Sequence, residues 1–141
     1  MNKGGRIDGR HKLRKEKVLI VEDNLQNMKL LEMLLRAKAY ILLKACDGEE
    51  ALDMAIREQP DLIVMDIQLP KMSGIEVTKR LRQMPVFSHT PIIALTAYAM
   101  RGDKERFMEA GCNAYLSKPI STRELPVIID QMLQEHRENN A

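Results

Sequence analysis

The sequence is poor in aromatic residues and in cysteine. It holds no Trp and only 4% aromatic residues, so a core must be built from aliphatic side chains and from the 10 Met residues, which fill irregular gaps. Its two cysteines, Cys46 and Cys112, form no C-x-x-C pair and lie in apolar segments, which argues against a disulfide or a metal role. The apolar runs are far shorter than the ~18 residues that span a bilayer, and no signal-peptide core follows Met1. We therefore expect a cytoplasmic protein.

Length and charge predict one globular domain with a basic extension. A chain of 141 residues that is 45% hydrophobic can bury roughly two thirds of its unfolded surface. Residues 1–17 hold seven basic and two acidic side chains, whereas residues 18–141 hold fifteen and eighteen. The pairs Gly4-Gly5 and Asp8-Gly9 favour disorder in the basic stretch. We expect three segments: a basic disordered tail at 1–16, a folded domain at 17–134 and a frayed end at 135–141.

From Lys17 onwards, short apolar runs alternate with longer amphipathic segments. This alternation is typical of a parallel sheet with helices on both faces. An unbroken apolar run, as in Leu62–Met65, indicates a strand that is buried on both faces. The predicted strands are Val18–Val21, Tyr40–Ala45, Leu62–Asp66, Ile92–Leu95 and Ala114–Leu116.

Capping residues mark the predicted helix starts. Asn24 can cap the first helix, and Asp103 can cap a helix that runs to Ala110 and stops at Gly111. Pro126 lies inside the last predicted helix, so we expect that helix to be bent or to start late. Capping boxes, in which a carboxylate follows the cap by three residues, open the other helices at Asp47–Glu50, Ser73–Glu76 and Ser121–Glu124.

Polar side chains stand at the carboxyl ends of four predicted strands. They are Glu22, Asp23, Asp66, Thr96 and Lys118. In parallel sheets these ends meet at one edge, where ligands bind. Three carboxylates within a few Å raise one another's pKa unless a cation lies among them, and Mg²⁺ prefers oxygen ligands. We therefore expect Mg²⁺ chemistry with phosphoryl transfer onto Asp66, while Lys118 neutralises charge and Thr96 donates its hydroxyl.

Four motifs occur in the order typical of one family. They are V-L-I-V-E-D-N from Val18, L-I-V-M-D-I-Q-L-P from Leu62, I-I-A-L-T-A from Ile92 and Y-L-S-K-P-I from Tyr115. From Val18 to about Leu133 the chain resembles the response-regulator receiver domain, and most of all the stand-alone receivers of the CheY and DivK kind. The resemblance implies a single doubly wound (βα)5 domain of the α/β class, flavodoxin-like, with a parallel five-stranded sheet in the order 2-1-3-4-5.

The resemblance also implies a role for each site residue. Asp66 is the phosphoacceptor, and the bulky Tyr98 suggests slow self-hydrolysis of the aspartyl phosphate. Mg²⁺, with Mn²⁺ as a substitute, is held by Glu22, Asp23, Asp66 and the backbone carbonyl of Gln68. The phosphoryl-binding and switch residues are Thr96, Ala97, Lys118 and Tyr115, Pro119 follows a cis peptide bond, and Gln68 and Tyr98 tune dephosphorylation.

The implied function is signalling rather than enzymatic turnover. A histidine kinase or histidine phosphotransfer protein supplies the phosphoryl group and docks near Leu25, Met28 and Met33. A downstream protein binds the face made by residues 103–110, strand 114–116 and the last helix. We expect no membrane or nucleic-acid partner.

Three alternatives stay open. The chain could be a receiver domain excised from a hybrid histidine kinase, or a nucleic-acid binder that acts through its basic tail. It could also be a haloacid-dehalogenase-like phosphatase, although that motif requires an aspartate where this chain has Gln68.

Overall fold

The computed structural model describes residues 15–97 and 102–139. In these ranges five parallel strands form one sheet in the order β2-β1-β3-β4-β5, as predicted. The strands are β1 (Lys17–Val21), β2 (Ile41–Ala45), β3 (Leu62–Asp66), β4 (Ile92–Thr96) and β5 (Ala114–Ser117), each within one residue of its predicted bounds. The helices are α2 (Leu25–Arg36), α3 (Gly48–Glu58), α4 (Gly74–Arg82), α5 (Asp103–Ala110) and α6 (Glu124–Asn139), with a 3₁₀ turn, η1, at Pro85–Phe87.

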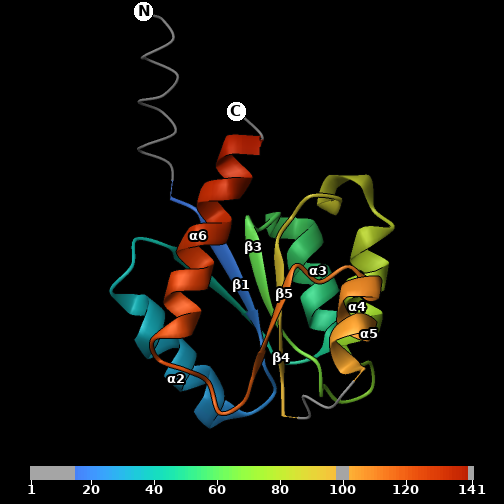
Figure 1. Cartoon of the computed structure of the whole chain (residues 1–141), viewed down its shortest axis with the longest axis horizontal. Coiled ribbons are helices and arrows are strands. Elements are labelled where there is room, and N and C mark those ends of the chain that lie inside the picture. Colours follow the sequence, from blue (N-terminus) through green and yellow to red (C-terminus); the bar gives the residue numbers. More distant parts are fainter. Residues whose placement is uncertain (1–14, 98–101, 140–141) are drawn as a thin grey trace, which may run out of the picture.

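Helices cover both faces of the sheet. In Figure 1, α2 and α6 lie on one side of the strands, and α3, α4 and α5 lie on the other. Successive strand residues point to opposite faces, so Val18 and Ile20 join the core under α2 and α6, whereas Leu19 and Val21 join the core under α3 to α5. All four side chains are fully buried. Because helices cover both faces of the sheet, the sequences of β1 and β3 contain continuous apolar runs.

The predicted caps explain where most helices begin. Asp47 Oδ1 accepts the Glu50 N–H at 2.8 Å, and the Glu50 carboxylate reaches back to the Cys46 N–H at 3.0 Å. Ser121 Oγ accepts the Glu124 N–H at 3.0 Å, but α6 is regular only from Glu124. Pro126 is thereby the third helical residue, where no interior N–H is needed, so the predicted late start is confirmed.

Two predictions about helix ends were wrong. Gly102, with a positive φ of 93°, occupies the cap position of α5, and Asp103 is the first helical residue. The Asp103 carboxylate accepts from Arg106 Nη1 at 2.8 Å, one turn along the helix. At the other end of the chain, α6 continues to Asn139 instead of fraying from residue 135. Its last turn is tied to the start of β1 by an ion pair between Arg137 and Glu16.

A polar clasp closes the edge of the sheet at which the strands begin. The Arg82 guanidinium, at the end of α4, donates to the Gly111 carbonyl at 2.7 Å and to the Phe87 carbonyl at 2.6 Å. It also donates to Asn113 Oδ1 at 2.9 Å, and that oxygen accepts the Ile92 N–H at 2.8 Å. One side chain thus joins α4, η1 and the segment between α5 and β5.

The start of α4 lies directly against the end of β3. A Cβ on Gly74 would lie 2.3 Å from the Asp66 carbonyl oxygen and 2.9 Å from Ile67 Cα. We expect Gly74→Ala to lower the free energy of unfolding by about 3 kcal/mol, because backbone must shift, as measured by denaturant melts. Gly48→Ala, at the first residue of α3, first meets a Val77 methyl at 2.9 Å, so a loss nearer ~1 kcal/mol is expected. Equal losses would contradict the argument.

The two cysteines differ in exposure, so they should differ in reactivity. Cys46 is exposed, and Cys112 is buried. Burial raises the pKa of the Cys112 thiol, and the thiolate is the reactive form. In folded protein, a thiol reagent should modify Cys46 alone, because Cys112 is both buried and held in its thiol form, as measured by mass spectrometry. Cys46→Ser should leave no fast-reacting thiol, and rapid labelling of that variant would show the expectation to be wrong.

Candidate functional site

Asp66 is the last residue of β3 and is almost completely buried, with 1% of its surface exposed. Its Oδ2 accepts from Lys118 Nζ at 2.9 Å, and its Oδ1 accepts the backbone N–H of Gln68 at 3.0 Å. Lys118 follows β5, so the parallel sheet brings together two residues that are 52 positions apart. Both carboxylate oxygens therefore have a donor within the protein.

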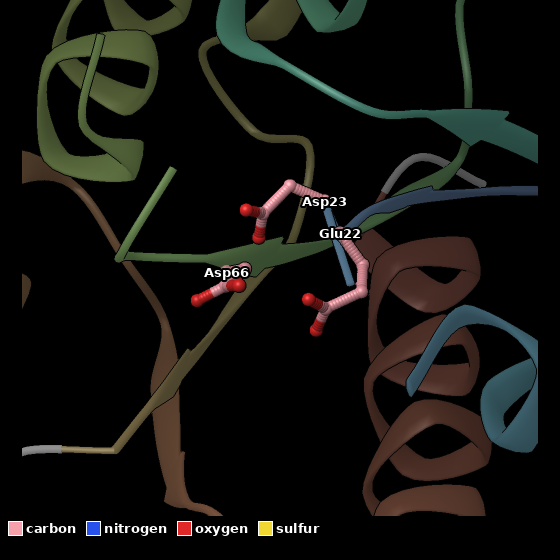
Figure 2. A group of neighbouring side chains, drawn as sticks. All are labelled: Glu22, Asp23 and Asp66. Carbon is pink, nitrogen blue, oxygen red and sulfur yellow. The ribbon is translucent and has the colours of Figure 1, made fainter. Parts of the chain in front are cut away.

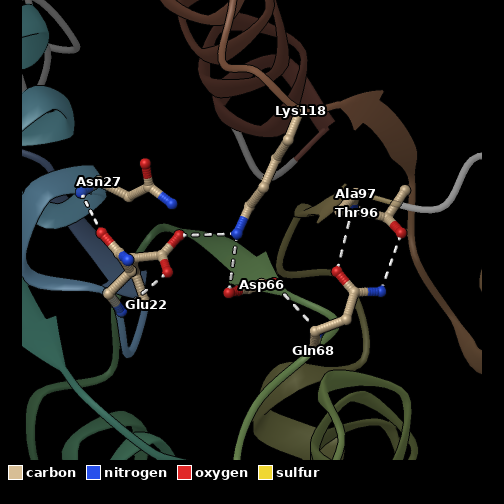
Figure 3. A network of polar contacts seen from close by, with 8 residues as sticks. Glu22, Asn27, Asp66, Gln68, Thr96, Ala97 and Lys118 are labelled. Atoms are coloured by element: carbon tan, nitrogen blue, oxygen red, sulfur yellow. Dashed lines mark hydrogen bonds and ion pairs between the residues drawn. The ribbon is translucent and has the colours of Figure 1, made fainter.

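Lys118 also pairs with a second buried acid. Its Nζ lies 3.2 Å from Glu22 Oε1, and the Glu22 side chain is fully buried after the end of β1. Glu22 Oε2 accepts the Asn24 N–H at 3.0 Å, whereas Oε1 has no hydrogen bond of good geometry. Figure 3 shows Lys118 reaching between Glu22 and Asp66. The Lys118 ammonium thus pairs with two carboxylates, and the ion pair with Lys118 is the contact that compensates the buried Glu22 Oε1.

Asp23 completes a cluster of three carboxylates. Glu22, Asp23 and Asp66 each offer an oxygen, and these oxygens all lie within 4.8 Å of one another. Figure 2 shows the three side chains gathered at the ends of β1 and β3. Three negative charges face one Lys118 ammonium, so the cluster favours a further cation. The incompletely satisfied Glu22 Oε1 and the all-oxygen donor set fit a hard ion such as Mg²⁺.

The electrostatics of the site follow from burial and from these pairs. Burial raises the pKa of Asp66, the Lys118 hydrogen bond opposes that shift, and the Glu22 charge adds to it. For Lys118, burial favours the neutral amine, but contacts with Asp66 and Glu22 outweigh burial, and the pKa of the ammonium is raised. Lys118 is therefore a fixed positive charge at neutral pH.

Thr96, Gln68 and Ala97 form the opposite wall of the site. Thr96 ends β4 and is fully buried. Gln68 Nε2 donates to Thr96 Oγ1 at 3.0 Å, and Gln68 Oε1 accepts the Ala97 N–H at 3.1 Å. Figure 3 shows the carboxamide facing both groups. The sequence placed Gln68 near Asp66 but carried no signal for these contacts, because they link residues that are 28 and 29 positions apart.

The remaining predicted residues lie further from the acids. Tyr115, on β5, packs its ring against Phe107 of α5 with centroids 6.0 Å apart, and so lies on the core behind the site. The Lys118–Pro119 peptide bond is cis, as predicted. Tyr98 lies outside the described residues, so its predicted effect on hydrolysis stays a prediction.

Comparisons with known proteins agree on one family. Residues 18–130 match the response regulator receiver domain. The chain belongs to the response regulator receiver domain family.

Individual relatives agree with this assignment. The polar-differentiation response regulator DivK of Brucella anthropi is 55% identical over 74% of this chain and 85% of its own length. Among solved structures, the receiver domain of a sensor histidine kinase from Pseudomonas aeruginosa PAO1 has a TM-score of 0.79 and 37% identity over 86% of this chain and 99% of its own, with a magnesium ion coordinated in its active site cleft. The chemotaxis response regulator CheY4 of Vibrio cholerae has a TM-score of 0.79 and 28% identity over 84% and 99% of the two chains.

Membership in this family makes the chain a signalling domain of two-component systems, and receiver domains bind Mg²⁺ at an acidic pocket. Between residues 15 and 139, leaving aside 98–101, no helix is long and apolar enough to cross a membrane. The cytoplasmic location expected from the sequence stays a prediction.

The Lys118 ammonium should be a strong contributor to the stability of the receiver domain. Lys118→Met keeps the apolar stem but leaves two buried carboxylates without their cation, so we expect the free energy of unfolding to fall by about 3 kcal/mol without Mg²⁺. The control is Lys38→Met, because Lys38 pairs with Asp130 at 2.8 Å with both side chains well exposed. That exposed pair should be worth less than ~1 kcal/mol.

The fall in the free energy of unfolding caused by Lys118→Met should depend on pH, and the direction of that dependence follows from the two pKa shifts. The stabilisation by Lys118 is present throughout the neutral range, because the raised pKa of the ammonium is reached only at alkaline pH. Towards acid pH, Asp66 takes up a proton early because its pKa is raised, and a neutral carboxyl needs no cation. The gap between wild type and Lys118→Met should therefore shrink as pH falls, and a gap that widens in denaturant melts would contradict this account.

Proposed function

We propose that Asp66 accepts a phosphoryl group from a phosphohistidine on a partner protein, with Mg²⁺, and that the receiver domain signals by changing a protein-binding face. The observation that carries the proposal is the buried Asp66 carboxylate, which is paired with Lys118 and lies beside two further carboxylates. A carboxylate can act as the nucleophile in such a transfer. The family and the likeness to DivK support this function over the phosphatase and nucleic-acid alternatives.

In the proposed reaction an Asp66 carboxylate oxygen forms a bond to phosphorus while the bond to the histidine nitrogen breaks, and the imidazole leaves. Lys118 moves from pairing with the carboxylate to pairing with a phosphoryl oxygen, which keeps its charge compensated. The Thr96 hydroxyl and the Ala97 N–H are donors at the opposite wall. Bound Mg²⁺, held by Glu22, Asp23, Asp66 and the Gln68 carbonyl, would neutralise charge on the transferred group.

The proposed output passes from Thr96 to Tyr115. Thr96 moves towards the phosphoryl group, and the Tyr115 ring follows on the neighbouring strand, where Tyr115 is paired in register with Ala94. The face made by α5, β5 and α6 would carry the change to a downstream protein. On that face Met108 and Val127 are 42% and 63% exposed, which suits an apolar partner.

The proposed docking site for the phosphodonor lies on α2. Leu25 and Met33 are each 68% exposed, so both are available to a histidine kinase or a histidine phosphotransfer protein. Met28, which the sequence predicts on the same surface, is instead 5% exposed and belongs to the core, because it faces the sheet. The likeness to DivK, at 55% identity, exceeds the likeness to the receiver domain of a sensor histidine kinase, at 37%, and this supports a regulator of the DivK kind.

Phosphorylation with a small donor tests the proposed function. Wild-type protein incubated with Mg²⁺ and acetyl phosphate should gain one phosphoryl group that is acid-stable and base-labile, as measured by intact mass. Asp66→Asn should gain none, because its amide is not a nucleophile, and EDTA should prevent labelling of the wild type. The matched control is Asp61→Asn, just before the other end of β3, where Asp61 Oδ2 accepts the Lys17 N–H at 2.8 Å.

Asp61→Asn should label like the wild type, because an amide oxygen can keep that hydrogen bond. Equal labelling of wild type and Asp66→Asn, or no labelling of the wild type, would refute the proposal.

A further inference from the structure

The Gln68 carboxamide holds both donor groups of the wall opposite Lys118. The N–H of Ala97 can only donate, so the Gln68 oxygen must face it, and this fixes the amide with its nitrogen towards Thr96. The two contacts, at 3.1 and 3.0 Å, have ordinary hydrogen-bond lengths. Gln68 therefore makes a bidentate contact with groups that, in the proposed function, receive a phosphoryl group.

The backbone of the same residue is anchored on the acid. The Gln68 N–H donates to Asp66 Oδ1 at 3.0 Å. The following loop is fixed by the Gly74 N–H, which donates to the Ile67 carbonyl at 3.0 Å. A rotation of the Gln68 side chain would therefore leave the hydrogen bond between its backbone and Asp66 in place.

We propose that in the unphosphorylated protein the Gln68 carboxamide holds the two groups, the Thr96 hydroxyl and the Ala97 N–H, that would bind a phosphoryl group, and that it is displaced when Asp66 is phosphorylated. The inference rests on the proposed function. Gln68 acts in it as a positioning residue, through Thr96 and Ala97, and not as a catalytic residue.

Competition for one hydrogen is the physical basis of the displacement. The Ala97 N–H has a single hydrogen, so it cannot serve Gln68 Oε1 and a phosphoryl oxygen together at full strength. The Thr96 hydroxyl can accept from Gln68 while it donates elsewhere, but the Gln68 contact holds it at 3.0 Å from the carboxamide. Phosphorylation must therefore break one hydrogen bond and disturb a second, which lowers the affinity of the site for the phosphoryl group.

An equilibrium titration with beryllofluoride and Mg²⁺ tests the inference without interference from hydrolysis. Beryllofluoride is a tetrahedral mimic of a phosphoryl group on a carboxylate, and calorimetry or NMR can follow it in a chain without Trp. Gln68→Ala and Gln68→Met remove both hydrogen bonds, and Met keeps a similar length. Both variants should bind about tenfold more tightly than the wild type, equivalent to about 1.4 kcal/mol. Gln131→Ala, on an exposed position of α6, should bind like the wild type.

Two further measurements distinguish displacement of the Gln68 carboxamide from a general effect of the substitution on the structure. In unphosphorylated protein, the Ala97 amide should exchange its hydrogen faster in Gln68→Ala, because Ala97 is otherwise exposed. In a Thr96→Val background, where one of the two contacts is already gone, Gln68→Ala should improve beryllofluoride binding by only about threefold.

The outcomes separate this inference from the proposed function. If the Gln68 variants bind beryllofluoride as tightly as the wild type or more weakly, the proposed displacement of Gln68 is wrong. Binding by the wild type in the same titration would still support the phosphoacceptor role of Asp66. If the Ala97 amide exchanges its hydrogen at the same rate in Gln68→Ala as in the wild type, the proposed displacement is also wrong. No binding or labelling of the wild type overturns the proposed function, and this inference with it.

Discussion

One ammonium group shared by two buried carboxylates is the interaction on which the site depends. Lys118 lies 2.9 Å from Asp66 and 3.2 Å from Glu22, and both acids are almost completely buried. A buried charge destabilises a fold strongly unless it is paired, so Lys118 makes it possible for Glu22 and Asp66 to be buried at the ends of β1 and β3. Because Asp23 adds a third negative charge, Lys118 does not neutralise the cluster fully, and the three carboxylates together could hold a metal ion.

The parallel sheet explains why these groups meet. Strands β1, β3, β4 and β5 all end at one edge, so residues separated by up to 96 positions, from Glu22 to Lys118, become neighbours. Contact of Gly74 with the end of β3 fixes the loop that carries Gln68 close to Asp66. The backbone at this edge is therefore closely held where it carries Asp66 and Gln68.

The sequence predicted the strands and most helix starts because these depend on local patterns. Apolar runs covered on both faces and capping pairs such as Asp47 with Glu50 leave a signal within a few residues. Contacts between loops leave none, so the bridge from Gln68 to Thr96 and Ala97 was not foreseen, although the residues themselves were. The residue type of Asp103 predicts a helix cap, but the preceding Gly102 occupies the cap position with a positive φ. The last turn of α6 forms an ion pair with Glu16, a residue 121 positions away, and local patterns carry no signal for such a contact.

The Arg82 clasp has a mechanical consequence for α5. It binds the Gly111 carbonyl, just after the end of that helix, and holds it to α4 and η1 at the edge of the sheet remote from Asp66. The other end of α5 is connected to Thr96 through residues 97–102. In the proposed function, a displacement that begins at Thr96 would therefore reach a helix whose far end is held by Arg82, so the first turn of α5 would move more than its last turn. Under the same proposal, a partner that distinguishes the two states of Asp66 would gain most from contacts with α5 near Asp103.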